Sequence, residues 1–303
     1  MATTRLVAST GVHLCVVEHA PDATGPTVVL VHGYPDRQEM WDPVVRWLTG
    51  RGLRVVSYDV RGAGRSGAPA RRSGYRCERL VDDLVAVLDA VLPAGEAAHL
   101  VGHDWGSIQL WDAVAAEPTD PRLRGRVATF TSVSGPSLDH VAWLARHARG
   151  RRVAMLRQLA HSWYVWLFQV PVLPGLVWRL AGRALRRTAT RLEGTDHWGP
   201  GMPRDAARGV DLYRANVPRR LARPRPLEVR VPVLVVHPRH DRFLTGVLTE
   251  GLEHGCTDVR VVEVEAGHWF PRTHPEETAH LVAGHVRAHA TRPGQAGAGS
   301  RGA

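Results

Sequence analysis

The pentapeptide Gly102-His103-Asp104-Trp105-Gly106 follows an apolar run at residues 98–102 and precedes a helical pattern at residues 107–116. The two glycines permit a sharp strand-to-helix turn, because glycine tolerates backbone conformations that other residues avoid. Such a turn presents its central side chain above the end of a sheet. A helix-capping aspartate is the alternative, but the flanking glycines favour the strained turn. We therefore predict that Asp104 is a nucleophile.

Short apolar runs and helical patterns alternate on both sides of this turn. Runs typical of strands occupy residues 12–17, 28–32, 54–59, 98–102 and 127–133, and again 231–238 and 259–265. Helical patterns occupy residues 41–48, 79–92, 107–116 and 275–289. This order predicts an α/β fold with a mostly parallel, doubly wound sheet, entered by an antiparallel hairpin at the N-terminus. Chemistry is then expected at the carboxyl ends of the strands.

The alternation breaks at Gly135 and resumes near Val231. The segment between is rich in Trp, Arg and Pro and is predicted to be a helical lid over the strand ends. The predicted organisation is a first core part at 1–135, a lid at 136–228, a second core part at 229–291 and a flexible Gly/Ala/Ser-rich tail at 292–303.

Composition excludes several classes of protein. The chain has 303 residues, of which 44% are hydrophobic, and three scattered cysteines with neither a CxxC pair nor zinc-like spacing. We expect no disulfide framework and no metal site, and, with no signal-peptide pattern, a cytoplasmic protein. The sequence at 62–67 formally matches GxGxxG, but no helix opens there, so no dinucleotide cofactor is expected.

Positive charge is concentrated in the predicted lid. The net charge is +10, and residues 146–191 contain ten arginines and no acidic residue. This concentration of arginines does not indicate nucleic-acid binding, because the segment contains no recognisable nucleic-acid-binding motif. Residues 158–178 carry no charge, but Pro171 and Pro174 argue against a membrane span. We expect this stretch to pack on the core and line a tunnel, and the arginines to permit a weak peripheral contact with anionic lipid.

A base and an acid follow the last strands. His268 comes just after the strand at 259–265, and Asp241 follows the strand at 231–238. The order nucleophile, acid, histidine is that of the Ser…Asp…His hydrolases. Asp139, after the strand at 127–133, is the rival acid. Chain order favours Asp241 over Asp139 but leaves the choice open.

The stretch His32-Gly33-Tyr34-Pro35 follows the strand at 28–32 and supplies a tight turn. Its backbone can approach Asp104, so we predict that the N–H groups of Tyr34 and Trp105 form an oxyanion hole, supported by His32, Gly33 and Pro35. The Tyr34–Pro35 bond is a candidate for the cis form.

An aspartate at the elbow changes the reaction class. A carboxylate displaces a leaving group from an sp3 carbon and becomes an alkyl ester. The ester is then hydrolysed, which requires a base to activate water and an oxyanion hole for the intermediate on the aspartate's own carbonyl.

The chain closely resembles the α/β-hydrolase-fold family of epoxide hydrolases and haloalkane dehalogenases. The resemblance rests on HGYP (32–35), DVRGAGRS (59–66), GHDWGS (102–107), Asp241 and His268 taken together. The resemblance spans roughly residues 5 to 290. It implies an epoxide hydrolase whose lid tyrosines, Tyr164 and Tyr213, hold and protonate the epoxide oxygen. We expect a hydrophobic epoxide in a pocket lined by Trp105, Phe168 and Trp269.

Two other functions remain open. A haloalkane dehalogenase shares the nucleophile and base but needs halide-binding N–H donors. A non-catalytic ligand-binding module on the same fold is the other, and the intact set of nucleophile, acid and base argues against it. The patterns at 135–140, 162–171 and 212–216 also resemble the N-terminal half of larger actinobacterial proteins that carry a short-chain dehydrogenase domain. The particular epoxide, its stereochemistry and the oligomeric state are not predicted.

Overall fold

The computed structural model describes residues 2–147 and 149–290, and the predicted tail at 292–303 lies outside them. One eight-stranded sheet has the order β1-β2-β4-β3-β5-β6-β7-β8. Only the pairs β1–β2 and β2–β4 are antiparallel. The strands are β1 Thr3–Ser9, β2 Val12–His19, β3 Thr27–Val31, β4 Arg54–Tyr58, β5 Ala98–His103, β6 Val127–Val133, β7 Val233–Pro238 and β8 Val259–Val264.

The central strands are apolar because both faces of the sheet are covered. Every residue of β3, β5 and β7 is buried, as expected for parallel strands between two helical layers. The edge strand β8 instead carries the charged residues Arg260 and Glu263, which discourage pairing with another strand. β7 begins at Val233 and not at 231, since Pro232 has no N–H to donate to the ladder.

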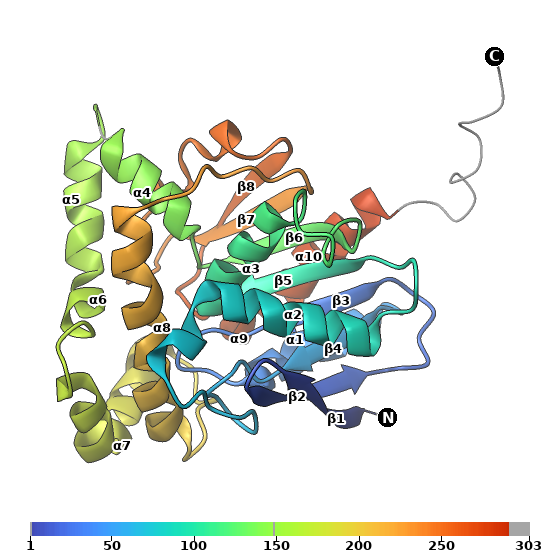
Figure 1. Cartoon of the computed structure of the whole chain (residues 1–303), viewed down its shortest axis with the longest axis horizontal. Coiled ribbons are helices and arrows are strands. Elements are labelled where there is room, and N and C mark those ends of the chain that lie inside the picture. Colours follow the sequence, from blue (N-terminus) through green and yellow to red (C-terminus); the bar gives the residue numbers. More distant parts are fainter. Residues whose placement is uncertain (1, 148, 291–303) are drawn as a thin grey trace.

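Two helical layers enclose the sheet (Figure 1). The helices α2 (Cys77–Val91) and α3 (Trp105–Ala116) cover one face, and α1 (Asp42–Thr49), α9 (Phe270–Thr273) and α10 (Pro275–His289) cover the other. α3 is buried on nearly all sides, including its polar residues Ser107, Gln109 and Asp112, and so lacks the polar, solvent-facing side of a surface helix. Short 3-10 helices occupy Gln38–Trp41, Arg72–Tyr75, Gly246–Thr249 and Leu252–His254.

Five helices lie between β6 and β7 in the chain and stand at the left in Figure 1. They are α4 Leu138–Arg146, α5 Arg152–His161, α6 Trp163–Leu167, α7 Leu173–Glu193 and α8 Met202–Ala222. α8 lies next to the core, and α5, α6 and α7 form the outer column. The uncharged stretch 158–178 is divided among three helices, and no helix of the described chain is long and apolar enough to cross a membrane.

Candidate active site

Asp104 sits on the turn between β5 and α3. Its backbone adopts φ 52° and ψ −120°, a strained conformation for a non-glycine residue. The turn is tight on both sides, because a Cβ at Gly102 would lie 2.5 Å from Ser107 N and one at Gly106 would lie 2.0 Å from Val31 O. The flanking glycines are therefore required by close backbone approach.

Two backbone donors meet the Asp104 carboxylate. The N–H of Tyr34 donates to Asp104 Oδ1 at 2.6 Å, and the N–H of Trp105 also stabilises the charged form. Burial has the larger effect and raises the pKa of Asp104 to about 6. The Tyr34–Pro35 bond is cis, as expected. The structure thus places Asp104 Oδ1 on the Tyr34 N–H and brings the second predicted donor, the Trp105 N–H, to the same carboxylate.

His268 lies between Asp104 and Asp241. Its Nδ1 is 2.7 Å from Asp241 Oδ2, and its Nε2 is 3.7 Å from Asp104 Oδ2. Asp241 Oδ1 accepts hydrogen bonds from the N–H groups of Phe243 and Leu244 at 2.8 and 3.1 Å. These contacts fix the carboxylate, which in turn orients the imidazole ring.

The charges around His268 set its protonation. Burial lowers the pKa of His268, but the Asp241 carboxylate, followed by the Asp104 carboxylate, outweighs it and raises the pKa to about 9. Burial likewise opposes ionisation of Asp241, yet His268 lowers the pKa of this carboxyl below its usual value. At neutral pH the free site therefore holds two carboxylates around one imidazolium.

The rival acid Asp139 lies elsewhere. It sits on α4, where Arg220 Nη1 donates to its Oδ2 at 2.5 Å and the N–H of Arg225 donates to its Oδ1 at 2.8 Å. Asp112 shares the same guanidinium groups. Asp139 is thus a structural ion-pair residue, and Asp241 is the acid beside His268.

Tyr164 on α6 and Tyr213 on α8 meet above the elbow. Their ring centroids are 5.9 Å apart, and Tyr213 packs edge-on against Trp105 at 4.9 Å. Burial, followed by nearby negative groups, raises the pKa of both phenols. Both hydroxyls therefore stay protonated at neutral pH and are available as donors.

Asp104, Trp105, Tyr164 and Tyr213 line one cavity of about 160 Å³. Most of its other lining residues are apolar and come from α4, α5, α6, α8 and the segment that follows β7. They include Met155, Leu159, Val165, Leu244 and Leu248. An apolar chamber with a few convergent polar groups is typical of a site for a small hydrophobic ligand.

Two of the three predicted pocket residues are corrected. Trp105 lines the cavity, but Phe168 packs behind the tyrosines, with its ring 5.0 Å from that of Tyr213. Trp269 is held on another side of His268, where its Nε1 donates to Asp36 Oδ2 at 2.8 Å. Neither side chain is among the residues that line the cavity.

Asp36 is a site neighbour that the sequence did not single out. Its buried Oδ1 accepts a hydrogen bond from Trp198 Nε1 at 2.7 Å and lies 2.7 Å from His197 Nε2. With Trp269 on Oδ2, this one carboxylate ties the lid to the loop that carries His268. Burial opposes its ionisation, but His197 and His103 hold the pKa of Asp36 well below its usual range. The only feature of the local sequence that could have pointed to Asp36 is its position directly after the HGYP turn.

Gln158 on α5 is a second residue that was not predicted. Its Oε1 accepts from the N–H of Thr245 at 2.7 Å, and its Nε2 donates to Phe243 O at 2.9 Å. The lid is thereby fastened to the loop that follows Asp241. The sequence feature that could have indicated Gln158 is its place as a polar residue within an apolar stretch.

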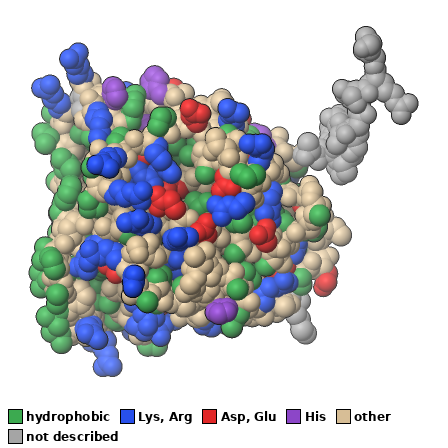
Figure 2. All heavy atoms as spheres, in the orientation of Figure 1, with side chains coloured by type: hydrophobic (Ala, Val, Ile, Leu, Met, Phe, Trp, Pro, Cys, Tyr) green, Lys and Arg blue, Asp and Glu red, His purple; other side chains and the backbone are tan. Residues whose placement is uncertain are grey.

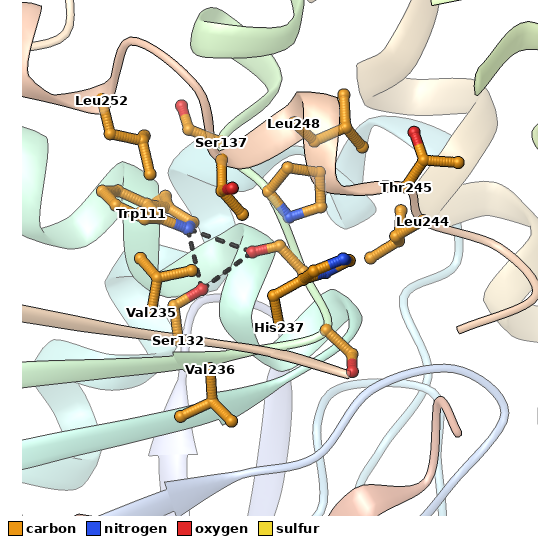
Figure 3. Close-up of a pocket in the computed structure, with 14 residues that line it drawn as sticks. Trp111, Ser132, Ser137, Val235, Val236, His237, Leu244, Thr245, Leu248 and Leu252 are labelled. Carbon is orange, nitrogen blue, oxygen red and sulfur yellow. Dashed lines mark hydrogen bonds between the residues drawn. The ribbon is translucent and has the colours of Figure 1, made fainter. Parts of the chain in front are cut away.

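A smaller cavity of about 30 Å³ lies under the strand ends and is lined by Trp111, Ser132 and His237 among others (Figure 3). Trp111 Nε1 donates to Gly135 O at 3.0 Å and to Ser132 Oγ at 3.2 Å. None of the predicted site residues lines it. The larger cavity beside Asp104 is therefore the candidate active site.

Gly33 gives a stability test of the supporting turn. A Cβ at this position would lie 2.4 Å from Asp104 Oδ1, so Gly33→Ala forces the turn away from the elbow. We expect a loss of about 1–3 kcal/mol in the free energy of unfolding, as for other overpacked sites. Gly284→Ala in α10 is the matched control, because its Cβ meets nothing within 4 Å. Urea denaturation of both variants measures the difference, and equal stabilities would contradict the tight contact.

His32 braces the same turn. Its Nδ1 lies 2.9 Å from Gly33 O, and its Nε2 accepts from the N–H of Val60 at 2.9 Å. The ring thereby joins the ends of β3 and β4. This places His32, Gly33 and Pro35 in the turn that presents the Tyr34 N–H.

Known proteins resemble the chain in sequence and in fold. A model of the alpha/beta hydrolase fold family matches residues 26–275. Over 293 residues the chain is 36% identical to a Mycobacterium tuberculosis protein named probable oxidoreductase EphD, covering 92% of this chain and 48% of that protein. Over 137 residues it is 39% identical to epoxide hydrolase A of the same organism, covering 45% of this chain and 39% of that protein.

The chain thus spans about half the length of the first of these relatives and less of the second. Among solved structures, a Bacillus megaterium epoxide hydrolase bound to an inhibitor superposes with a TM-score of 0.77 at 20% identity. That match covers 93% of this chain and all of the other. The similarity extends through the sheet and the helices between β6 and β7.

Proposed function

Because this chain belongs to the alpha/beta hydrolase fold family, and two lid tyrosines face the same cavity as an elbow aspartate, we propose that it is an epoxide hydrolase. Its substrate is a hydrophobic epoxide and its product a vicinal diol. The observation that carries the proposal is the meeting of Tyr164 and Tyr213 with Asp104 in one apolar cavity. The similarity to epoxide hydrolase A supports it.

The first step is alkylation. Asp104 Oδ2 attacks an epoxide carbon, the carbon–oxygen bond breaks, and a tyrosine hydroxyl gives its proton to the leaving oxygen. The electron pair of the broken bond stays on that oxygen, which becomes a hydroxyl of the future diol. The tyrosine recovers a proton from solvent. The proposal assigns this acid role to Tyr164 and Tyr213 together.

The second step is hydrolysis of the ester. Alkylation removes the negative charge of Asp104, which is one of the groups that raises the pKa of His268. His268 then gives up its proton and acts as the base that takes a proton from water. The hydroxide attacks Asp104 Cγ, and the oxyanion on Oδ1 is stabilised by the N–H groups of Tyr34 and Trp105. Collapse of the intermediate releases the diol, which takes its proton from His268.

The two steps are expected to differ in their dependence on pH. Alkylation needs the Asp104 carboxylate, whose pKa burial raises to about 6, so its rate should rise as pH increases through that value. Hydrolysis needs neutral His268. The ester of Asp104 carries no charge, so the pKa of His268 should fall below its value of about 9 in the free site. The hydrolysis rate should then rise as pH increases through this lower pKa. Stopped-flow single-turnover traces from about pH 4.5 to about pH 9.5 separate the steps. An alkylation rate that does not change across pH 6 contradicts this assignment.

The proposed function is tested with a panel of terminal, aryl and long-chain epoxides beside haloalkanes, with diol and halide release as readouts. Diol formation from at least one hydrophobic epoxide, lost in Asp104→Ala, is expected. Halide release without diol formation would favour the alternative below. Stoichiometric ligand binding without turnover would favour the non-catalytic module, which the aligned Asp104, His268 and Asp241 argue against.

One observation favours haloalkane dehalogenation as the alternative. Trp105 Nε1 is buried and, within the described part of the chain, donates no hydrogen bond, although Trp105 lines the cavity. An indole N–H in that position suits a halide leaving group. The paired tyrosine hydroxyls suit an epoxide oxygen better, so this function takes second place.

A further inference from the structure

The outer helices of the lid expose an unusual amount of apolar surface. Twelve of the sixteen large apolar side chains that are exposed in the described chain lie between residues 153 and 180. We call this exposed side of α5, α6 and α7 the lid face. Its members include Val153, Leu156, Trp163, Val172 and Leu180, of which Leu180 is 79% exposed. Figure 2 shows hydrophobic side chains along the left edge of the molecule, where Figure 1 places these helices. A gathering of exposed apolar side chains of this kind is typical of an interaction surface.

The segment that carries the lid face is positively charged. Residues 146–191 contain no acidic residue. Eight exposed arginines of this segment form no ion pair within the described residues, among them Arg152, Arg157, Arg179, Arg183 and Arg187. An apolar surface with unneutralised arginines at its border matches the boundary between acyl chains and anionic headgroups.

A groove between α7 and α8 adjoins the lid face at Leu180. Four arginines line it, Arg179, Arg183, Arg204 and Arg208, and no acidic residue does. Among the described residues, only Arg204 of these four forms an ion pair, with Asp205 at 3.0 Å. Guanidinium groups bind phosphate oxygens through paired N–H donors. The groove therefore suits the phosphate of a lipid headgroup.

The active-site cavity reaches the lid face. Leu159 and Trp166 both line the cavity that contains Asp104, and each side chain is also 49% exposed on the lid face. The cavity therefore lies directly behind the lid face at these two side chains of α5 and α6. The uncharged stretch at 158–178, which was expected to pack on the core and line a tunnel, thus has two sides, one on the cavity and one on solvent.

We propose that the lid face docks on an anionic lipid bilayer, with lipid phosphates in the arginine groove and acyl chains against α5, α6 and α7. A lipid-chain epoxide then enters beside Leu159 and Trp166 without crossing water. The entry route rests on the proposed epoxide hydrolase function, whereas the docking does not. A second copy of the chain is a poor occupant, because two such faces would bring arginines together with no acid to neutralise them.

Vesicle flotation of the full chain tests the docking. Phosphatidylglycerol vesicles at low ionic strength are expected to bind the protein at least tenfold more tightly than phosphatidylcholine vesicles. Binding to the anionic vesicles should fall steeply at about 1 M salt, where screening extends over only ~3 Å. No binding to anionic vesicles at low salt overturns the proposal.

Two pairs of variants locate the surface. Arg179→Gln with Arg183→Gln is expected to weaken binding by about thirtyfold, because each arginine near an anionic surface contributes about 1 kcal/mol. Arg260→Gln with Arg287→Gln removes the same charge from exposed residues of β8 and α10, away from the lid. This control should lose less than about threefold. Equal losses in the two double variants would assign the binding to net charge and overturn the proposal.

The apolar contribution has its own matched control. Leu156→Ser, Trp163→Ser and Leu180→Ser together should abolish vesicle binding, whereas Leu6→Ser with Val261→Ser, at exposed sites outside the lid, should not. Sedimentation velocity is run in parallel. A dimer that dissociates in the lid variant, with no vesicle binding by the parent, would assign the face to a second copy and overturn the proposal.

Turnover separates docking from chemistry. The lid-face triple variant should hydrolyse a short water-soluble epoxide at the parent rate but lose at least about tenfold on a long-chain epoxide embedded in anionic vesicles. Equal rates on the embedded substrate overturn the entry route. If no epoxide is hydrolysed, flotation still decides the docking, so failure of one proposal is distinguishable from failure of the other.

Discussion

A chain carrying His268→Gln is expected to form an ester on Asp104 and to stop there. Alkylation needs only the carboxylate and a proton donor, but hydrolysis needs a base for water, and the nearest one is removed. Steady-state diol formation should fall by roughly 10⁴-fold, the scale seen when a catalytic unit loses its base. Intact-mass analysis after a single addition of epoxide should show the protein with one substrate attached. Peptide mapping should place the adduct on Asp104.

Two controls sharpen this experiment. His280→Gln removes an exposed histidine of α10 and should leave turnover unchanged. A single turnover of the parent chain in heavy-oxygen water should place the label in the Asp104 carboxylate, because water attacks the ester carbonyl and not the substrate carbon. Label in the first diol with none in the protein would rule out the two-step mechanism.

The double variant Tyr164→Phe with Tyr213→Phe should lower the alkylation rate by about 100-fold or more, with each single change giving a smaller loss. The phenols lie over the elbow, and their raised pKa values keep them protonated, so the double change removes the proton donors for the epoxide oxygen while keeping the aromatic packing. Burst-phase measurement of ester formation isolates this step from hydrolysis.

Tyr58→Phe is the matched control for the tyrosine variants. Its hydroxyl is buried in β4 and, among the described residues, has no hydrogen-bond partner, so its removal should not slow alkylation. A double variant that opens epoxides at the parent rate contradicts the assignment. Retained halide release together with lost diol formation would favour the dehalogenase.

The pair of carboxylates after β6 and β7 illustrates the limit of sequence order. Asp139 and Asp241 both follow strands and both precede His268, so chain order favours one but does not choose between them. The tertiary structure decides, because Arg220 and Arg225, more than eighty residues from Asp139 in the chain, neutralise that carboxylate. Asp241 is left to pair with His268 at 2.7 Å.

The local sequence by itself therefore determined the strands of the sheet and the two turns of the site. The apolar runs fixed the strands, and glycine around Asp104 and at position 33 fixed the elbow and its facing turn, because close backbone approach excludes any side chain there. Contacts across long sequence separations were decided only by the tertiary structure. Asp36 meets His197 and Trp198 across more than 160 residues, and no local pattern records such a pairing.

The lid shows the same division. Its apolar residues and arginines were evident from sequence, but a run without charge predicts burial and does not tell which side of a helix meets protein. The structure stacks α5, α6 and α7 as an outer layer, so Leu159 and Trp166 reach the cavity while Val153 and Leu180 face solvent. Which surfaces of a helix are buried depends on the layers around it, and those are set only when the whole chain folds.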